Sequence, residues 1–237
     1  MLQGGFSAVL SADSRDDFRG EVVRFTQQLG FNTVSAMMVQ DRAAGRADFV
    51  VVNNAPPGCE AVLDDVASMR RDPVMQHCRR HPFPIVWDQS TYTKEGLGEL
   101  WEAQAHFGFC TGIAMALHLP QGRHFVLGVE RDAPLPVNSV ELNRLVADLQ
   151  LFAVHAQDAA LRVMSPGTEL IERPALTPRE LEALRWTMEG KTAWEVGAIL
   201  GISERTAVLH VNNAMHKLAC ASKHQAVLKA LRLGLIG

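Results

Sequence analysis

Apolar residues along the first two thirds of the chain alternate between the spacing of helices and that of strands. The pattern predicts a helix capped by Asp13 or Ser14, strands at residues 33–40 and 47–55, helices over about residues 60–80, broken near Pro73, and 95–106, and a β-hairpin of residues 112–120 and 124–132. Because strands and helices are interleaved, we expect a sheet with helices on both faces.

A long helix with one apolar stripe closes this part of the chain. Its stripe consists of Leu142, Leu145, Val146, Leu149, Phe152, Ala153, Ala156 and Ala160. The stripe is a candidate dimer contact or a core face. Three prolines and one glycine follow within residues 164–178 and indicate a linker. We therefore predict an N-terminal domain at 1–163, a linker at 164–175 and a C-terminal domain at 176–237.

Four short helices are predicted in the C-terminal domain. Capping-box patterns mark three helix starts, at Thr177-x-x-Glu180, Thr192-x-x-Glu195 and Ser222-x-x-Gln225, and Ser203 is a plain N-cap. Apolar residues recur at helical spacing after each cap. A short turn at Gly201-Ile202 joins the second and third helices, which is typical of a helix-turn-helix. The last helix, with Leu231 and Leu235, is a second candidate dimer contact.

Composition fits a folded protein with an anion-binding appendage. The chain has 237 residues, of which 47% are hydrophobic and 21% charged. No apolar run approaches the roughly 18 residues of a membrane span, and the start of the chain lacks the basic segment of a secretory signal. The four cysteines are far apart, which favours a reducing cytoplasm. Residues 170–237 carry a net charge of +3 and the rest −6, so the C-terminal domain could meet nucleic acid.

The C-terminal domain closely resembles the LuxR-type helix-turn-helix. The residues that carry the resemblance are Leu176, Thr177, Arg179, Glu180, Leu184, Gly190, Lys191, Thr192, Glu195, Ile199, Leu200, Ser203, Thr206, His210, Asn213, Ala214, Lys217, Leu218, Ala226, Gly234 and Leu235. The resemblance implies double-stranded DNA as partner, with the third helix in the major groove. Outward-facing candidates for base contact are Arg205, Thr206, Val208, Asn212 and Asn213. Candidates for phosphate contact are Lys191, Thr192, His210, Lys217 and Lys223.

The N-terminal domain resembles the quorum-sensing branch of that family, whose members bind acyl-homoserine lactones. Segments 70–87 and 100–122 carry the resemblance, with Asp72, Trp87, Trp101 and Gly112 at matching positions. The resemblance implies an α/β/α sandwich around an acyl chain, so that the whole chain is an α+β protein. It also implies that Asp72 accepts the ligand's amide N–H and that Trp87 packs on the lactone ring. The alternatives are a helix cap for Asp72 and a core position for Trp87.

Four positions depart from the family's ligand site. Cys59 stands where the family usually has a tryptophan, Leu63 and Ala55 where it has tyrosines, and Gly128 where it has a hydroxyl residue. The chain's single tyrosine, Tyr92, reflects these losses. Ligand oxygens left without partners would cost roughly 1–3 kcal/mol each. The pocket is therefore atypical, and it binds an acyl-homoserine lactone differently, takes another small apolar signal, or needs none.

A ligand-responsive transcription factor is thus the first functional hypothesis. The second is a ligand-independent regulator, or an antagonist that heterodimerises with another receptor of this type. The histidines form no metal-ligand motif and there is no nucleotide or hydrolase signature, so an enzyme, a metal or a cofactor is not expected. Expected partners are a small-molecule autoinducer, DNA, a second copy of the chain and RNA polymerase, and no membrane.

Overall fold

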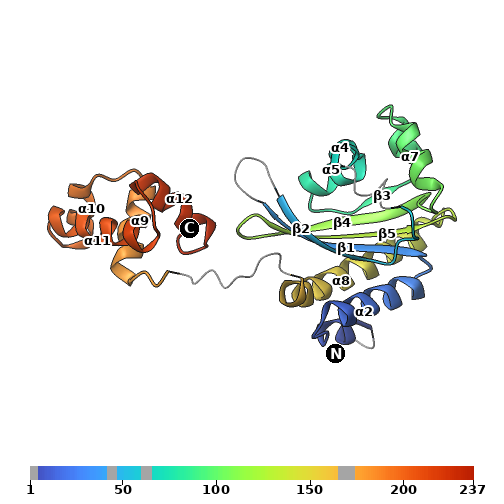
Figure 1. The fold of residues 1–237 in the computed structure, drawn as a ribbon, viewed down its shortest axis with the longest axis horizontal. Helices are drawn as coiled ribbons and strands as arrows, with labels where there is room; N and C mark the ends of the chain where they lie inside the picture. The colour runs from blue at the N-terminus through green and yellow to red at the C-terminus, as the bar shows by residue number, and fades with distance from the viewer. Residues whose placement is uncertain (1–4, 42–46, 60–65, 165–173) are drawn as a thin grey trace. The chain divides into compact units, whose positions relative to one another are not determined.

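One antiparallel sheet organises the N-terminal part of the chain (Figure 1). The computed structural model describes residues 5–41, 47–59, 66–164 and 174–237. Its strands are β1 (Thr33–Asp41), β2 (Ala47–Asn53), β3 (Ile85–Trp87), β4 (Thr111–Leu119) and β5 (Arg123–Arg131), in the order β2-β1-β5-β4-β3. All neighbouring pairs are antiparallel, including the expected β4–β5 hairpin.

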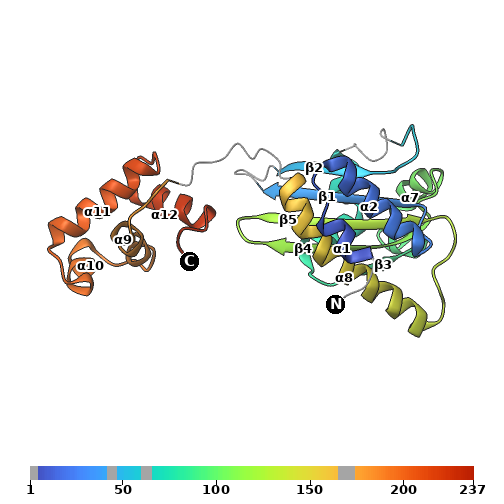
Figure 2. The same cartoon turned by 90° about the horizontal axis from the view of Figure 1, so that it is seen from below.

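Helices cover both faces of the sheet, as the pattern predicted. One face carries α1 (Gly5–Leu10), α2 (Arg15–Gln28) and α8 (Ser139–Val163), which Figure 2 shows in front of the strands. The other carries α4 (Val66–Arg71), α5 (Pro73–Arg80) and α7 (Gly98–Ala105) (Figure 1). The short α6 (Gln89–Thr93) follows β3. The N-terminal domain is therefore an α/β/α sandwich.

The two faces of the sheet are chemically different. On β5, Phe125, Leu127 and Val129 point into the main core beneath α2 and α8. The residues between them alternate to the opposite face, because successive side chains of a strand point to opposite sides. That face carries the apolar Val126 but also Gly128 and Glu130. The main core is thus continuous and apolar, whereas the second face leaves room for a site.

Helix α8 packs its apolar stripe inward. Leu149, Phe152, Ala153, Ala156 and Ala160 are fully buried in the main core. The stripe is therefore a core face, and its role as a dimer contact is not supported. On the outward side of the same helix, Val140, Leu151 and Val154 remain exposed.

Four helices form the C-terminal unit, as expected. They are α9 (Pro178–Met188), α10 (Ala193–Leu200), α11 (Glu204–Lys217) and α12 (Lys223–Arg232). Thr177 and Thr192 form the predicted capping boxes, and Gly201 ends α10 with a left-handed φ of 67°. Ser222 caps α12, but the predicted box is incomplete, because the Gln225 side chain accepts from the amide of Ala221.

The structure departs from the expected elements in a few places. The helix expected over residues 60–80 consists, where described, of α4 and α5, and it breaks at Asp72; residues 60–65, including Leu63, lie outside the described residues. So do residues 165–173, which make up most of the expected linker. Helices α1 and α6 and strand β3 were not predicted. No helix among the described residues has the length and apolarity to cross a bilayer.

Candidate ligand pocket and nucleic-acid interface

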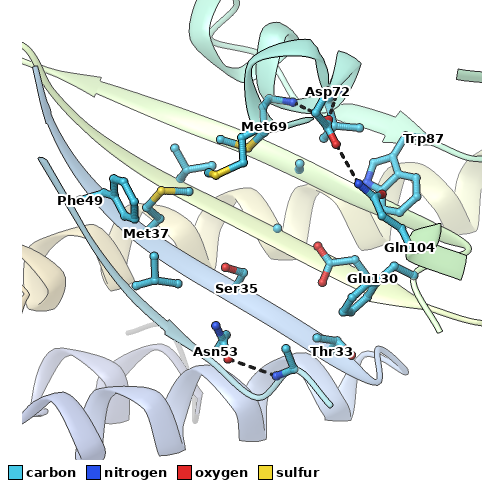
Figure 3. A pocket seen from close by; sticks show the side chains of 18 of the residues that line it. Thr33, Ser35, Met37, Phe49, Asn53, Met69, Asp72, Trp87, Gln104 and Glu130 are labelled. Carbon is cyan, nitrogen blue, oxygen red and sulfur yellow. Dashed lines mark hydrogen bonds between the residues drawn. The ribbon is translucent and has the colours of Figure 1, made fainter. Parts of the chain in front are cut away.

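A cavity of about 210 Å³ lies between the second face of the sheet and the helices that cover it. Strands β1, β2, β4 and β5 supply its floor, and Figure 3 shows the Asp72 segment on its opposite side. Most of its lining is apolar, with Met37, Phe49 and Met69 among the side chains. Asp72, Gln104 and Glu130 lie at the end near Trp87, whereas Ser35 and Asn53 lie farther along the floor (Figure 3). This combination of an apolar body and a few convergent polar groups is typical of small-molecule sites.

Four of the eight predicted ligand residues line this cavity: Asp72, Trp87, Ala55 and Gly128. Cys59 is buried in the hydrophobic cluster around the cavity rather than in its wall. Trp101 packs at the edge of that cluster, where its indole N–H donates to the carbonyl of Cys110 at 3.0 Å. Leu63 is outside the described residues. The predicted site therefore comes together in part.

Asp72 is held by four hydrogen bonds. Its Oδ1 accepts from the backbone amides of Val74 (2.8 Å) and Met75 (3.1 Å), so that it caps α5. Its Oδ2 accepts from the Tyr92 hydroxyl and from Gln104 Nε2, both at 3.1 Å. The cap that the sequence suggested is confirmed. Burial and the neighbouring Asp72 carboxylate raise the pKa of Tyr92, which keeps its hydroxyl protonated as a donor.

Trp87 lies across the sheet over Gly112. The two residues are paired in the β3–β4 ladder, and a Cβ at Gly112 would lie 2.7 Å from the indole ring and 2.4 Å from the carbonyl oxygen of Val129. Gly112 therefore leaves the space that the indole ring fills, and it is not among the residues that line the cavity. Trp87 is buried, and its Nε1 is the one buried side-chain polar atom of the described residues without a hydrogen-bond partner.

Glu130 lines the pocket but was not among the residues predicted from the sequence. It lies on β5 opposite Thr33 and lines the cavity together with Asp72 and Trp87. Burial, assisted by the negative charge of Asp72, raises the pKa of Glu130 to about 8. The alternation along β5 could have found it, because residues 126, 128 and 130 share one face.

A shallow groove in the C-terminal unit gathers four of the predicted DNA-binding residues. Lys191, Val208, Asn212 and Lys223 line it, from the start of α10, from α11 and from the start of α12. Arg205 and Asn213 are exposed on α11, and so is the unpredicted Leu209. Thr206 and His210 are half-buried, and Thr206 is hydrogen-bonded to Ser203. Thr192 is exposed and serves as the N-cap of α10.

Lys217 has an internal partner. Its Nζ lies 2.9 Å from Oε2 of Glu180 and 3.2 Å from the carbonyl oxygen of Ala175. Glu180 is buried; desolvation alone would raise its pKa, but hydrogen bonds from Lys217 and Thr177 outweigh that effect and lower it. The structure thus gives Lys217 a stabilising contact between α9 and α11, and the phosphate contact expected from the sequence stays a prediction.

Two family models match the chain, and residues 161–173 lie between the two matched ranges. Residues 14–160 match the autoinducer binding domain and residues 174–230 match the luxR family of bacterial regulatory proteins. The chain is 32% identical to the transcriptional activator SolR of Ralstonia nicotianae over 94% of this chain and 93% of that protein. It is 32% identical to the quorum sensing-dependent regulator RpaR of Rhodopseudomonas palustris, over 87% of this chain and 83% of that protein.

The fold also matches solved structures of SdiA. A crystal structure of the Escherichia coli protein superimposes with a TM-score of 0.74 at 25% identity, over 98% of this chain and 94% of that one. A structure of SdiA in complex with octanoyl-rac-glycerol gives a TM-score of 0.72 at 25% identity, over 99% and 98%.

Pocket, helix-turn-helix and comparisons together define a class: a DNA-binding regulator with a signal-binding domain, not an enzyme. The chain belongs to the LuxR family of transcriptional regulators, in its quorum-sensing branch. Within the described residues no group of three or more His, Cys, Asp or Glu side chains is placed to hold a metal ion.

Proposed function

We propose that the N-terminal cavity binds an acyl-homoserine lactone or a similar small acyl compound, and that this binding controls transcription through the C-terminal domain. The observation that carries the proposal is the cavity itself, which is apolar along most of its wall and polar at one end. An acyl chain suits the apolar part, at about 0.8 kcal/mol per buried methylene. The octanoyl compound bound to SdiA combines the same two parts.

The buried N–H of Trp87 favours this hypothesis over a ligand-independent regulator. A buried donor without a partner costs about 1–3 kcal/mol, and a bound carbonyl would remove that cost. The proposed working form is a cytoplasmic homodimer on a two-fold symmetric site, in contact with RNA polymerase. The outward face of α8, with Val140, Leu151 and Val154, and the exposed Leu228 and Leu231 of α12 supply apolar surface for the dimer.

The test of the signal site is what the full chain retains on purification. Cells expressing it are supplied with N-octanoyl-homoserine lactone, and the small molecules bound to the pure protein are identified by mass spectrometry. We expect about one acyl molecule per chain. Val126→Phe, which fills the cavity, should abolish retention, whereas Val86→Phe on an exposed position of β3 should not. Folded protein that carries no acyl compound would contradict the proposal.

The DNA interface makes a separate prediction. Asn212→Ala should relax base preference at one position of each half-site, at a cost of about 1–3 kcal/mol, because an amide side chain can read adenine. Lys223→Ala should weaken all sequences alike and lower the salt slope by about one. Lys217→Ala should instead lower the melting temperature, because it leaves Glu180 buried without its partner. Selection from randomised duplexes, titration over salt and thermal melting distinguish these three results; an unchanged base preference in Asn212→Ala would remove that residue from the interface.

A further inference from the structure

Two polar groups of the pocket have no hydrogen-bond partner in the described part of the chain. One is Trp87 Nε1, whose side chain is 4% exposed. The other is the carboxyl of Glu130, which makes no hydrogen bond or ion pair there and points into the space below the Asp72–Gln104 pair (Figure 3). One group is a donor and the other can accept, so the pocket presents a complementary pair to a ligand.

The Asp72 carboxylate, by contrast, has no lone pair left to accept a further hydrogen bond. A carboxylate offers about four lone-pair sites, and Asp72 already accepts four hydrogen bonds. A ligand N–H could bind it only by displacing Tyr92, Gln104 or a backbone amide of α5. Displacing any of these would leave a buried donor without a partner.

The sheet brings Glu130 and Trp87 into one row. Thr33, Glu130, Gly112 and Trp87 are direct neighbours across β1, β5, β4 and β3. Gly112 has no side chain, so the indole lies over it toward Glu130. Gly128 also leaves space: a Cβ there would lie 2.9 Å from Oε1 of Glu130. The Glu130 carboxyl therefore occupies room that a side chain at position 128 would take.

We propose that Glu130 accepts the ligand's N–H or O–H hydrogen bond while Trp87 Nε1 donates to the ligand's carbonyl oxygen. The inference rests on the proposed signal-binding function and adds the chemical class of the ligand: an acyl compound with a hydrogen-bond donor beside a carbonyl. A carboxyl accepts from such a donor in either protonation state. Two carboxyls in one apolar pocket also disfavour an anion, so a free fatty acid should bind poorly.

The test uses two probes that differ in one group. N-octanoyl-homoserine lactone has an amide N–H, and α-octanoyloxy-γ-butyrolactone has an ester oxygen in its place. We expect the unmodified full chain to bind the amide about ten-fold more tightly, measured by calorimetry. Glu130→Met should remove this preference by weakening the amide alone. Glu130→Gln, which keeps a carbonyl acceptor, should retain most of it.

Two further variants test whether the preference depends on the position of the Glu130 carboxyl. Gly128→Ala changes no polar group, but its Cβ should displace the Glu130 carboxyl and so reduce the preference as well. Glu102→Met removes an exposed carboxyl on α7 and should change nothing. Thermal melting checks that each variant is folded.

Three outcomes would overturn the inference. Equal binding of the two probes by the unmodified chain would refute it while the signal-binding function stands. A preference that survives Glu130→Met but disappears in Asp72→Asn would make Asp72 the acceptor. Binding of neither probe would contradict the proposed function, and with it this inference.

Discussion

Asp72→Ala should lower the free energy of unfolding of the N-terminal domain by about 3–7 kcal/mol. Loss of a helix cap costs about 1 kcal/mol, and each buried donor left without a partner costs about 1–3 kcal/mol. The donors that lose their acceptor in this variant are the Tyr92 hydroxyl and the Gln104 side-chain amide, both buried. The measurement is urea unfolding of the ligand-free chain, followed by tryptophan fluorescence.

The chain contains a matched control for this prediction. Asp88 is also an N-cap, accepting from the amide of Ser90 at 2.8 Å, but it is exposed and holds no buried side chain. Asp88→Ala should therefore cost only about 1 kcal/mol. Equal losses for the two variants would show that the Tyr92 and Gln104 contacts contribute little. If the losses differ as expected, the Asp72→Ala variant is much less stable than the unmodified chain. Its failure to respond to a signal would then be explained by lost stability before a lost ligand contact is considered.

The elements that the sequence predicted well are those with local signals. A helix N-cap can be recognised from the capping residue and the three residues that follow it. All four such caps that the sequence indicated begin helices in the structure: Ser14, Thr177, Thr192 and Ser203. The hairpin at residues 111–131 has a strong alternation and a short turn. Strand β3, with three residues, is too short to show any period.

The contacts within the site could not be predicted from such local signals in the sequence. Asp72 binds Tyr92 and Gln104, which are 20 and 32 residues away, and Lys217 binds Glu180 at a separation of 37. Such pairs depend on strand register and helix packing, and the resemblance to the family supplied a role for Asp72 but no partner. The four departures at Ala55, Cys59, Leu63 and Gly128 were visible in the sequence. The position of the Glu130 carboxyl beside Gly128 could not be predicted, because it depends on the register of β5.

The second large effect concerns Glu130 and pH. Burial raises the pKa of Glu130 to about 8 in the folded chain, against an ordinary value of 4.5. The folded state therefore keeps a proton that the unfolded state has lost between about pH 4.5 and pH 8. Stability falls as pH rises through that window, because the native state binds more protons than the unfolded state. The other titratable groups among the described pocket residues are Asp72 and Tyr92. The charge of Glu130 contributes to the raised pKa of Tyr92, but the ordinary value of 10.0 already lies above this window, so the Tyr92 hydroxyl stays protonated with or without Glu130.

Glu130→Gln should remove this dependence. At pH 4, below the ordinary pKa of a glutamate, the two chains should unfold at nearly the same urea concentration, because both side chains are then mostly neutral in the folded and in the unfolded state. By pH 8 the variant should be more stable by about 2–4 kcal/mol, since each unit of pKa shift corresponds to about 1.4 kcal/mol and water in the cavity reduces the full effect. Glu102→Gln, on the exposed face of α7, should follow the unmodified chain at every pH. Unfolding curves of the unmodified chain and Glu130→Gln that stay parallel from pH 4 to pH 8 would mean that Glu130 is ionised in the folded pocket throughout, and that water or a retained ligand already satisfies its carboxylate.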